Sequence, residues 1–210
     1  MLGSGDVGKN ISAGLLRLGH EVAIGTRQPE KLSEWASNAG KGAKISSFQD
    51  TAKFGEIIFL CTKWEGTLNA IKLAGTHNFE GKIVVDVTNP LLFERQGDAP
   101  KPAVSYPESA GFRVQQWLAQ AKVVKAFNAV PANYMTNPKM EQGEPDLLMC
   151  GDEPAAKKQV SDIAAAWGWR EIADMGGIEH AHLLESLAIL WIRYGFLNNH
   201  WTHAFKILKK

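Results

Sequence analysis

Cysteine is scarce in this 210-residue sequence, which contains only Cys61 and Cys150. Two cysteines, with no signal peptide ahead of them, predict a reducing, cytoplasmic setting rather than a disulfide framework. Long hydrophobic runs are also missing. The most apolar stretch, 183–197, is interrupted by Glu185 and Arg193 and is shorter than the ~20 residues of a membrane-spanning helix. The formal net charge is only +1, which gives no general attraction for nucleic acid or anionic lipid. We therefore expect a soluble protein with neither nucleic acid nor membrane as partner.

Recognisable acid–base machinery is absent as well. The sequence has no nucleophile elbow and no paired carboxylates in a recognisable site context. Its six histidines include His200-x-x-His203, which could share one helical face, and His180-x-His182. A closed metal site needs three or four ligands with supporting partners. We therefore expect surface histidines and no metal.

A glycine fingerprint stands at the start of the chain, Gly3-x-Gly5-x-x-Gly8. This spacing is typical of a dinucleotide-binding turn, where a strand ends and a helix begins beneath a pyrophosphate. The segment that follows, 10–19, has apolar positions at helical spacing and ends in glycine. Only two residues precede the fingerprint, so we expect that the first strand is truncated and that part of the natural chain is missing before Met1.

Short apolar runs alternate with helical segments along most of the chain. Strands that are buried on both faces and separated by helices indicate a mostly parallel sheet with right-handed crossovers. We predict an α/β, Rossmann-type doubly wound fold over residues 1–175, followed by a wholly helical, apolar segment over 176–210. The predicted strands are Glu21–Gly25, Ala43–Ile45, Ile57–Cys61, Ile83–Val87, Val123–Phe127 and Asp146–Cys150.

The end of the second strand indicates which dinucleotide is bound. NAD-binding proteins usually place an acidic residue there, about 20 residues beyond the fingerprint, to accept hydrogen bonds from the ribose hydroxyls. This sequence instead has Thr26 and Arg27, with Lys31 nearby. A guanidinium binds a 2′-phosphate through paired, charge-assisted hydrogen bonds. The sequence therefore favours NADP(H).

Five segments occur in an order that resembles a known family: 3–8 (GSGDVG), 25–27 (GTR), 86–90 (DVTNP), 123–128 (VVKAFN) and 150–152 (CGD). Together they resemble the coenzyme F420-dependent NADP oxidoreductases, and they are also similar to the NADPH-binding domain of the STEAP metalloreductases. The resemblance covers nearly the whole chain. It implies hydride transfer between NADP(H) and a flat tricyclic acceptor, either the deazaflavin F420 or a flavin.

The resemblance also implies a set of site residues. The cofactor-binding positions would be Gly3, Ser4, Gly5, Asp6, Val7, Gly8, Thr26, Arg27, Lys31, Cys61, Thr62, Lys63, Asn89, Asn128 and Ala132. The candidates for the acceptor site are Asn128, Val130, His180 and His182. Ser4 to Val7 would line the pyrophosphate, 61–64 would pass beneath the ribose and nicotinamide, and 128–132 would form the floor where nicotinamide and acceptor stack. Lys63 stands where family members often have proline.

The segment 176–182 is expected to cover the acceptor. Gly176 and Gly177 can bend the chain back over the cleft, with Ile178, His180 and Leu184 forming an apolar wall. Deazaflavin-using members commonly carry arginine where this sequence has His182, which predicts that a flavin serves at least as well as the deazaflavin. The apolar tail predicts a homodimer, because one small sheet domain covers only part of such a helix.

Two alternatives remain open. One is an NADPH-binding sensor or regulatory protein without turnover, and the other is a reductase of a small carbonyl or imine.

Overall fold

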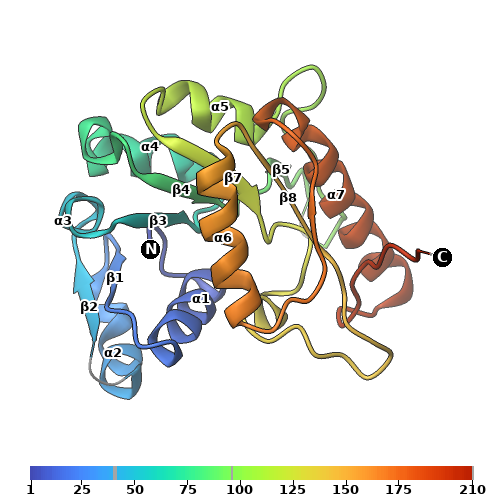
Figure 1. The fold of residues 1–210 in the computed structure, drawn as a ribbon, viewed down its shortest axis with the longest axis horizontal. Coiled ribbons are helices and arrows are strands. Elements are labelled where there is room, and N and C mark those ends of the chain that lie inside the picture. The colour runs from blue at the N-terminus through green and yellow to red at the C-terminus, as the bar shows by residue number, and fades with distance from the viewer. Residues whose placement is uncertain (40–41, 96, 210) are drawn as a thin grey trace.

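A computed structural model describes residues 1–39, 42–95 and 97–209. Helices cover both faces of a central sheet, and the long helix α7 lies along one end (Figure 1). The strands are β1 Val22–Gly25, β2 Ala43–Ser46, β3 Ile57–Leu60, β4 Ile83–Asp86, β5 Leu91–Leu92, β6 Lys101–Pro102, β7 Lys122–Ala126, β8 Leu147–Gly151 and β9 Ile172–Asp174. The α-helices are α1 Asp6–Arg17, α2 Ser33–Ala39, α3 Phe48–Phe54, α4 Trp64–Ala74, α5 Ala110–Trp117, α6 Pro154–Ala166 and α7 Ala181–Asn198. Short 3-10 turns are η1 Pro29–Leu32, η2 Thr76–Phe79, η3 Ala132–Tyr134 and η4 Ile178–His180.

The sheet is mostly parallel. One ladder runs in the order β3-β4-β7-β8-β9, and β1 pairs with β2 beside it. Only the β7–β8 pairing is antiparallel among these strands. The segment between β4 and α5 forms a small antiparallel hairpin of β5 and β6. The predicted α/β fold with a mostly parallel sheet and a C-terminal helix is confirmed.

Residues 1–3 occupy the position between β1 and β3. Leu2 bridges Gly25 on one side and Leu60 on the other, both in parallel. Its amide donates to the Phe59 carbonyl at 2.9 Å, and its carbonyl accepts from the Cys61 amide at 2.8 Å. A cavity of about 380 Å³ continues this position beyond Met1, lined by residues of β1 and β3.

Two apolar clusters pack on opposite faces of the sheet. One joins the sheet to α1 and α6, through residues such as Ile11 and Val160. The other joins it to α3, α4, α5 and the start of α7. The four residues of β4 are all buried, as expected for a strand covered on both faces. This layering leaves the loops at the strand ends free to form a site.

The segment after Asp174 differs from the expected all-helical tail. Strands β8 and β9 run opposite to β7, and Gly176 lies beside Gly151. Gly176 is therefore at the end of the strands opposite to the glycine turn. Helix α7 ends at Asn198, and Asn199 adopts a left-handed conformation with φ of 46°. Residues 199–209 then fold back without helix.

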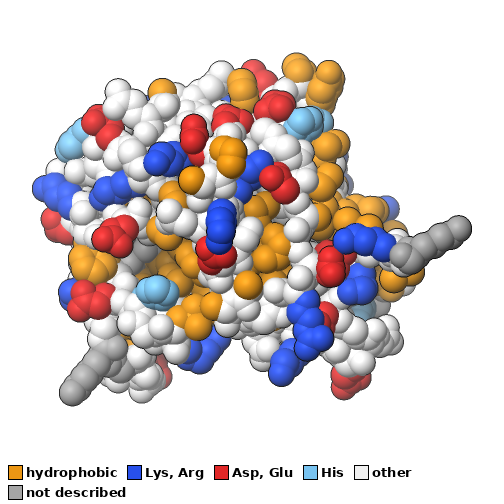
Figure 2. All heavy atoms as spheres, in the orientation of Figure 1, with side chains coloured by type: hydrophobic (Ala, Val, Ile, Leu, Met, Phe, Trp, Pro, Cys, Tyr) orange, Lys and Arg blue, Asp and Glu red, His pale blue; other side chains and the backbone are white. Residues whose placement is uncertain are grey.

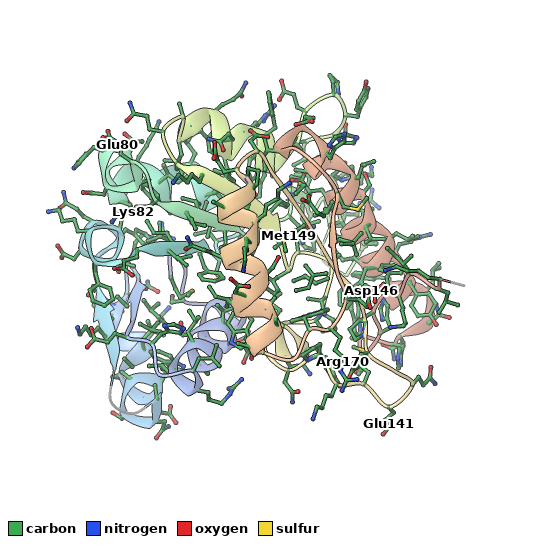
Figure 3. All side chains as sticks on the ribbon, viewed as in Figure 1. Glu80, Lys82, Glu141, Asp146, Met149 and Arg170 are labelled. Carbon is green, nitrogen blue, oxygen red and sulfur yellow. The ribbon has the colours of Figure 1, made fainter. Side chains whose placement is uncertain are left out.

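The returning segment is tied to the start of β8. The Asp146 amide donates to the Phe205 carbonyl at 3.1 Å, and the Asp146 carboxylate accepts from the Ile207 amide at 2.8 Å. Figure 3 labels Asp146 close to this segment. Among the helices that the structure describes, none is long and apolar enough to cross a membrane.

Candidate functional site

The three fingerprint glycines have different surroundings at the turn between Leu2 and α1. A Cβ on Gly3, whose φ is +117°, would lie 2.5 Å from the Cys61 carbonyl oxygen, and one on Gly8 would overlap the Gly3 carbonyl. A Cβ on Gly5 would meet nothing within 4 Å. Gly3 and Gly8 therefore serve the tight turn and the close helix packing, whereas Gly5 faces open space. This is the division of roles in a pyrophosphate-binding turn.

The first turn of α1 supplies donors at the same place. Gly5 is its N-cap, and no side chain caps this helix, so backbone N–H groups of the first turn have no side-chain partner. Such a helix start attracts anions through these N–H groups and the helix dipole. Asp6 lies in this turn with its side chain exposed. The turn therefore fits a dinucleotide pyrophosphate.

The end of β1 lies next to this turn. The hydroxyls of Ser4 and Thr26 are 3.2 Å apart, and Thr26 Oγ1 accepts from the Gln28 amide at 3.1 Å. Arg27 and Lys31 are both exposed. The structure thus brings two hydroxyls and the loop that carries two cations to the carboxyl end of β1, as the preference for a 2′-phosphate requires.

Cys61, Thr62 and Lys63 follow the carboxyl end of β3. Desolvation raises the pKa of the Cys61 thiol to about 12, so this cysteine is a protonated packing residue and not a reactive thiolate. Thr62 Oγ1 lies 2.8 Å from Thr67 Oγ1. Lys63 is exposed at the N-cap of α4 and gives that helix no side-chain cap.

Asn89 and Asn128 join the ends of β4 and β7. Asn89 Nδ2 donates to the Asn128 carbonyl at 2.7 Å, and Asn128 Nδ2 donates to Asn89 Oδ1 at 2.9 Å. Asn128 Nδ2 also donates to the Leu184 carbonyl of α7 at 2.9 Å. The two asparagines therefore form one rigid unit that also holds the first turns of α7.

Phe127, just before Asn128, has φ of +63°. This region is unusual for a bulky residue and marks strain at functional sites. Packing offsets the strain, because the buried ring lies edge-on to Trp167 and Trp169, with centroids 5.6 and 6.4 Å away. The strained residue turns the chain out of β7 so that Asn128 reaches Asn89.

The predicted acceptor residues fall on different sides of α7. Val130 lines a narrow space with Asn128, Leu184 and Phe205, next to Ala132 at the start of η3. His182 lines a separate cavity of about 120 Å³ between α7 and the β5–β6 hairpin. Its ring lies edge-on to Tyr106, with centroids 5.2 Å apart. The proposed site residues remain predictions, and the structure does not gather the four acceptor candidates into one cavity.

The expected apolar wall over the cleft is wrong in one part. Ile178 is 2% exposed and packs in the core, where its Cδ1 would be 3.4 Å from a Cβ on Gly111. The reason is that β9 runs parallel to β8 and therefore opposite to β7, which carries Gly176 and Gly177 away from the glycine turn. His180 is half-exposed, with Nδ1 3.4 Å from Glu179 Oε1.

The histidine pair near the C-terminus does not share a helical face. His200 and His203 lie beyond α7, and the ring of His203 stacks on Trp191 with centroids 4.7 Å apart. Within the described residues, no group of three or more His, Cys, Asp or Glu side chains is placed to hold a metal ion.

Three buried charged residues were not among the predicted site residues. Asp86 and Lys125 are fully buried at the ends of β4 and β7, and Glu185 of α7 is 4% exposed. A charged residue inside each of three apolar runs was the available signal, since buried charges are almost always paired.

Comparisons with known proteins point to one family. The model of the family "NADP oxidoreductase coenzyme F420-dependent" matches residues 1–90. An F420-dependent NADP reductase of Methanocaldococcus jannaschii is 32% identical over 203 residues, covering 90% of this chain and 88% of the relative. Metalloreductase STEAP3 of Rattus norvegicus is 29% identical over 90% of this chain, which spans only 36% of that protein. A crystal structure of a candidate F420-dependent NADP reductase from Arthrobacter sp. FB24 superimposes with a TM-score of 0.93 at 32% identity, covering 99% of this chain and 97% of the other.

Proposed function

Because this chain belongs to the coenzyme F420-dependent NADP oxidoreductase family, and is therefore an NADP-dependent oxidoreductase, we propose that it transfers hydride between NADP(H) and a flavin or deazaflavin. The family resemblance drawn from the sequence motifs is confirmed. The single observation that carries the proposal is the glycine turn, with open space at Gly5 beside the Thr26–Arg27 loop end.

In this reaction the residues of the site bind and align the two ring systems and transfer no proton. The first turn of α1 would hold the pyrophosphate, and Ser4, Thr26, Arg27 and Lys31 would hold the 2′-phosphate. The bound nicotinamide and the acceptor ring supply the electronic chemistry themselves. The chain has to align two rings at about 3–3.5 Å and exclude water. The Asn89–Asn128 unit is suited to aligning the rings, because its hydrogen bonds fix it in place. Neither asparagine has to act as an acid or a base in this reaction.

The acceptor remains the open part of the proposal. F420-linked relatives suggest the deazaflavin. His182 stands where deazaflavin-using members of the family commonly have an arginine, which would bind an anionic coenzyme tail. This difference supports the proposal that a flavin serves at least as well as the deazaflavin. The half-exposed ring of His182 beside Tyr106 gives an aromatic edge and no fixed positive charge.

Assembly and location form a further part of the proposal. The outer face of α7 exposes apolar side chains at helical spacing: Leu183, Leu190, Tyr194 and Leu197. Figure 2 shows apolar side chains gathered along the edge where Figure 1 draws α7. This face supports a homodimer. The two cysteines are free, which supports a reducing cytoplasmic setting.

An absorbance assay tests the function. NADPH is mixed with the protein and either FMN or coenzyme F420, and loss of the reduced nicotinamide band near 340 nm is followed. We expect turnover with both acceptors, at a rate with FMN no lower than with F420. Binding of NADPH with no turnover would favour a sensor, and turnover only with a small carbonyl or imine would favour the other alternative.

A variant pair places the reaction in the molecule. Asn128→Trp should abolish turnover, because the indole fills the floor between the two rings, and should leave NADPH affinity nearly unchanged. Retained affinity also shows that the variant folds. The matched control is Asn137→Trp at an exposed position, which should turn over normally. Normal turnover of Asn128→Trp would contradict the placement.

A further inference from the structure

A buried ionic cluster joins the sheet to two helices. Lys125 Nζ lies 2.9 Å from Asp86 Oδ2 and 3.1 Å from Glu185 Oε1. Nζ also donates to the Thr88 carbonyl. The three charged side chains come from β7, β4 and α7, and all are at least 95% buried.

The cluster holds one cation and two carboxylates, so its formal charge is −1. The extra negative charge has a partner in α5. Glu185 Oε2 accepts from the Ala110 amide and Oε1 from the Gly111 amide, each at 3.0 Å. These are the first two residues of α5, where free N–H groups and the helix dipole favour an anion. Burial alone would lower the pKa of Lys125, but the carboxylates of Asp86 and Glu185 raise it, which keeps the cation in place.

The same cluster continues into the proposed floor. Asp86 Oδ1 accepts from the Thr88 amide at 2.9 Å and from its hydroxyl at 2.7 Å, and this fixes the chain leading to Asn89. Asn89 pairs with Asn128, and Asn128 donates to the Leu184 carbonyl. Leu184 is adjacent to Glu185, so hydrogen bonds and ion pairs close a ring through β4, β7 and α7.

Glu185 also lines the cavity of about 120 Å³ beside His182. The opposite wall of that cavity is the β5–β6 segment, with Pro90 and Pro102. Helix α7 lies next to α5 at this end of the sheet (Figure 1). Any shift of α7 therefore changes the width of the cavity and the position of the Leu184 carbonyl together.

We propose that Glu185 is a positioning residue, which docks α7 on Lys125 and on the start of α5 and thereby sets the geometry of the acceptor side of the cleft. This inference rests on the proposed function only in the effect that it expects on acceptor binding. The docking of α7 by Glu185 does not depend on that function. The positions that would hold the pyrophosphate and the 2′-phosphate lie at the glycine turn and the end of β1, and among the described residues they share no hydrogen bond or ion pair with Glu185 or Lys125.

The test compares Glu185→Gln with Glu80→Gln. The side-chain amide that E185Q introduces would turn N–H donors toward groups that are themselves donors, whereas Glu80 is an exposed residue next to η2 (Figure 3). For E185Q we expect the KM for the acceptor to rise about tenfold or more, as for loss of a charged hydrogen bond. The Kd for NADPH should stay within about twofold and kcat within about threefold of the parent values. E80Q should match the parent protein in all three.

A second readout does not depend on activity. Hydrogen exchange of the backbone amides in 181–190 should be faster in E185Q than in E80Q, because local opening exposes them. Glu185→Asp keeps the carboxylate but shortens it by one methylene, so its KM and exchange rates should lie between those of the parent and E185Q. This variant also serves if E185Q does not fold.

The results of these measurements separate the two proposals. Unchanged exchange and unchanged KM in E185Q would overturn the positioning role. A rise in the Kd for NADPH as large as the rise in the KM for the acceptor would also overturn the positioning role, because it would indicate general destabilisation. Faster exchange in 181–190 of a protein that turns over no flavin or deazaflavin would retain the docking and reject the proposed function.

Discussion

At the scale of single residues, Arg27 is the side chain on which the choice of nucleotide depends most. It is exposed beside Thr26, whose hydroxyl faces Ser4. Arg27→Ala should weaken NADPH binding by roughly tenfold or more, because a charge-assisted hydrogen bond contributes about 1.5–3 kcal/mol. NADH affinity should hardly change, since NADH has no 2′-phosphate.

Fluorescence titration of both nucleotides measures this difference. Arg170→Ala is the matched control, because Arg170 is also exposed but pairs with Glu144 at 3.0 Å, far along the chain from the nucleotide loop (Figure 3). An equal loss of affinity for both nucleotides in R27A would contradict the assignment to NADP(H).

Residue-level prediction succeeded where a short motif carries its own geometry. The spacing of Gly3, Gly5 and Gly8 predicts a tight turn that leads into a helix, and in the structure α1 starts at Asp6 within this motif. The role of the three glycines in binding a nucleotide stays a prediction. The ion cluster was not predicted, because Lys125 and Glu185 are 60 positions apart in sequence. The left-handed Phe127 was missed too, since only its packing on two tryptophans permits that conformation.

At the scale of elements, local patterns placed six strands to within a residue, but they did not predict β5, β6 or β9 and they misjudged the tail. Apolar runs such as Ile83–Val87 are strands because both faces are covered. The apolar pattern of the tail predicted helix beyond Asn198 as well, yet residues 199–209 contain no helix. The backbone of this segment and Lys206 bond to Asp146 and Glu144 instead. Such tertiary contacts override local preference and cannot be read from periodicity.

At the scale of the whole molecule, the exposed face of α7 predicts association. Leu190 and Leu197 are 56% and 68% exposed, and an apolar face of this kind is typical of an interface. Light scattering at micromolar concentration should give twice the 23.0 kDa of one chain. Leu190→Glu should give a single chain, because a carboxylate would be buried without a partner.

Leu73→Glu is the control for this experiment. Leu73 is 50% exposed on α4, away from α7, and its substitution should leave the dimer intact. A single-chain mass for the parent protein would contradict the dimer, and a dimeric L190E would place the interface elsewhere.

The buried cluster of Asp86, Lys125 and Glu185 also constrains how this sequence can diverge. Loss of Lys125 alone would leave two carboxylates without a cation, and removing one partner of a buried ion pair costs about 3–5 kcal/mol, a large fraction of a typical domain's ~5–15 kcal/mol. Loss of one acid still leaves a neutral pair. A lineage could therefore reach an uncharged version of this site only through a particular order of substitutions, in which an acid changes before the lysine.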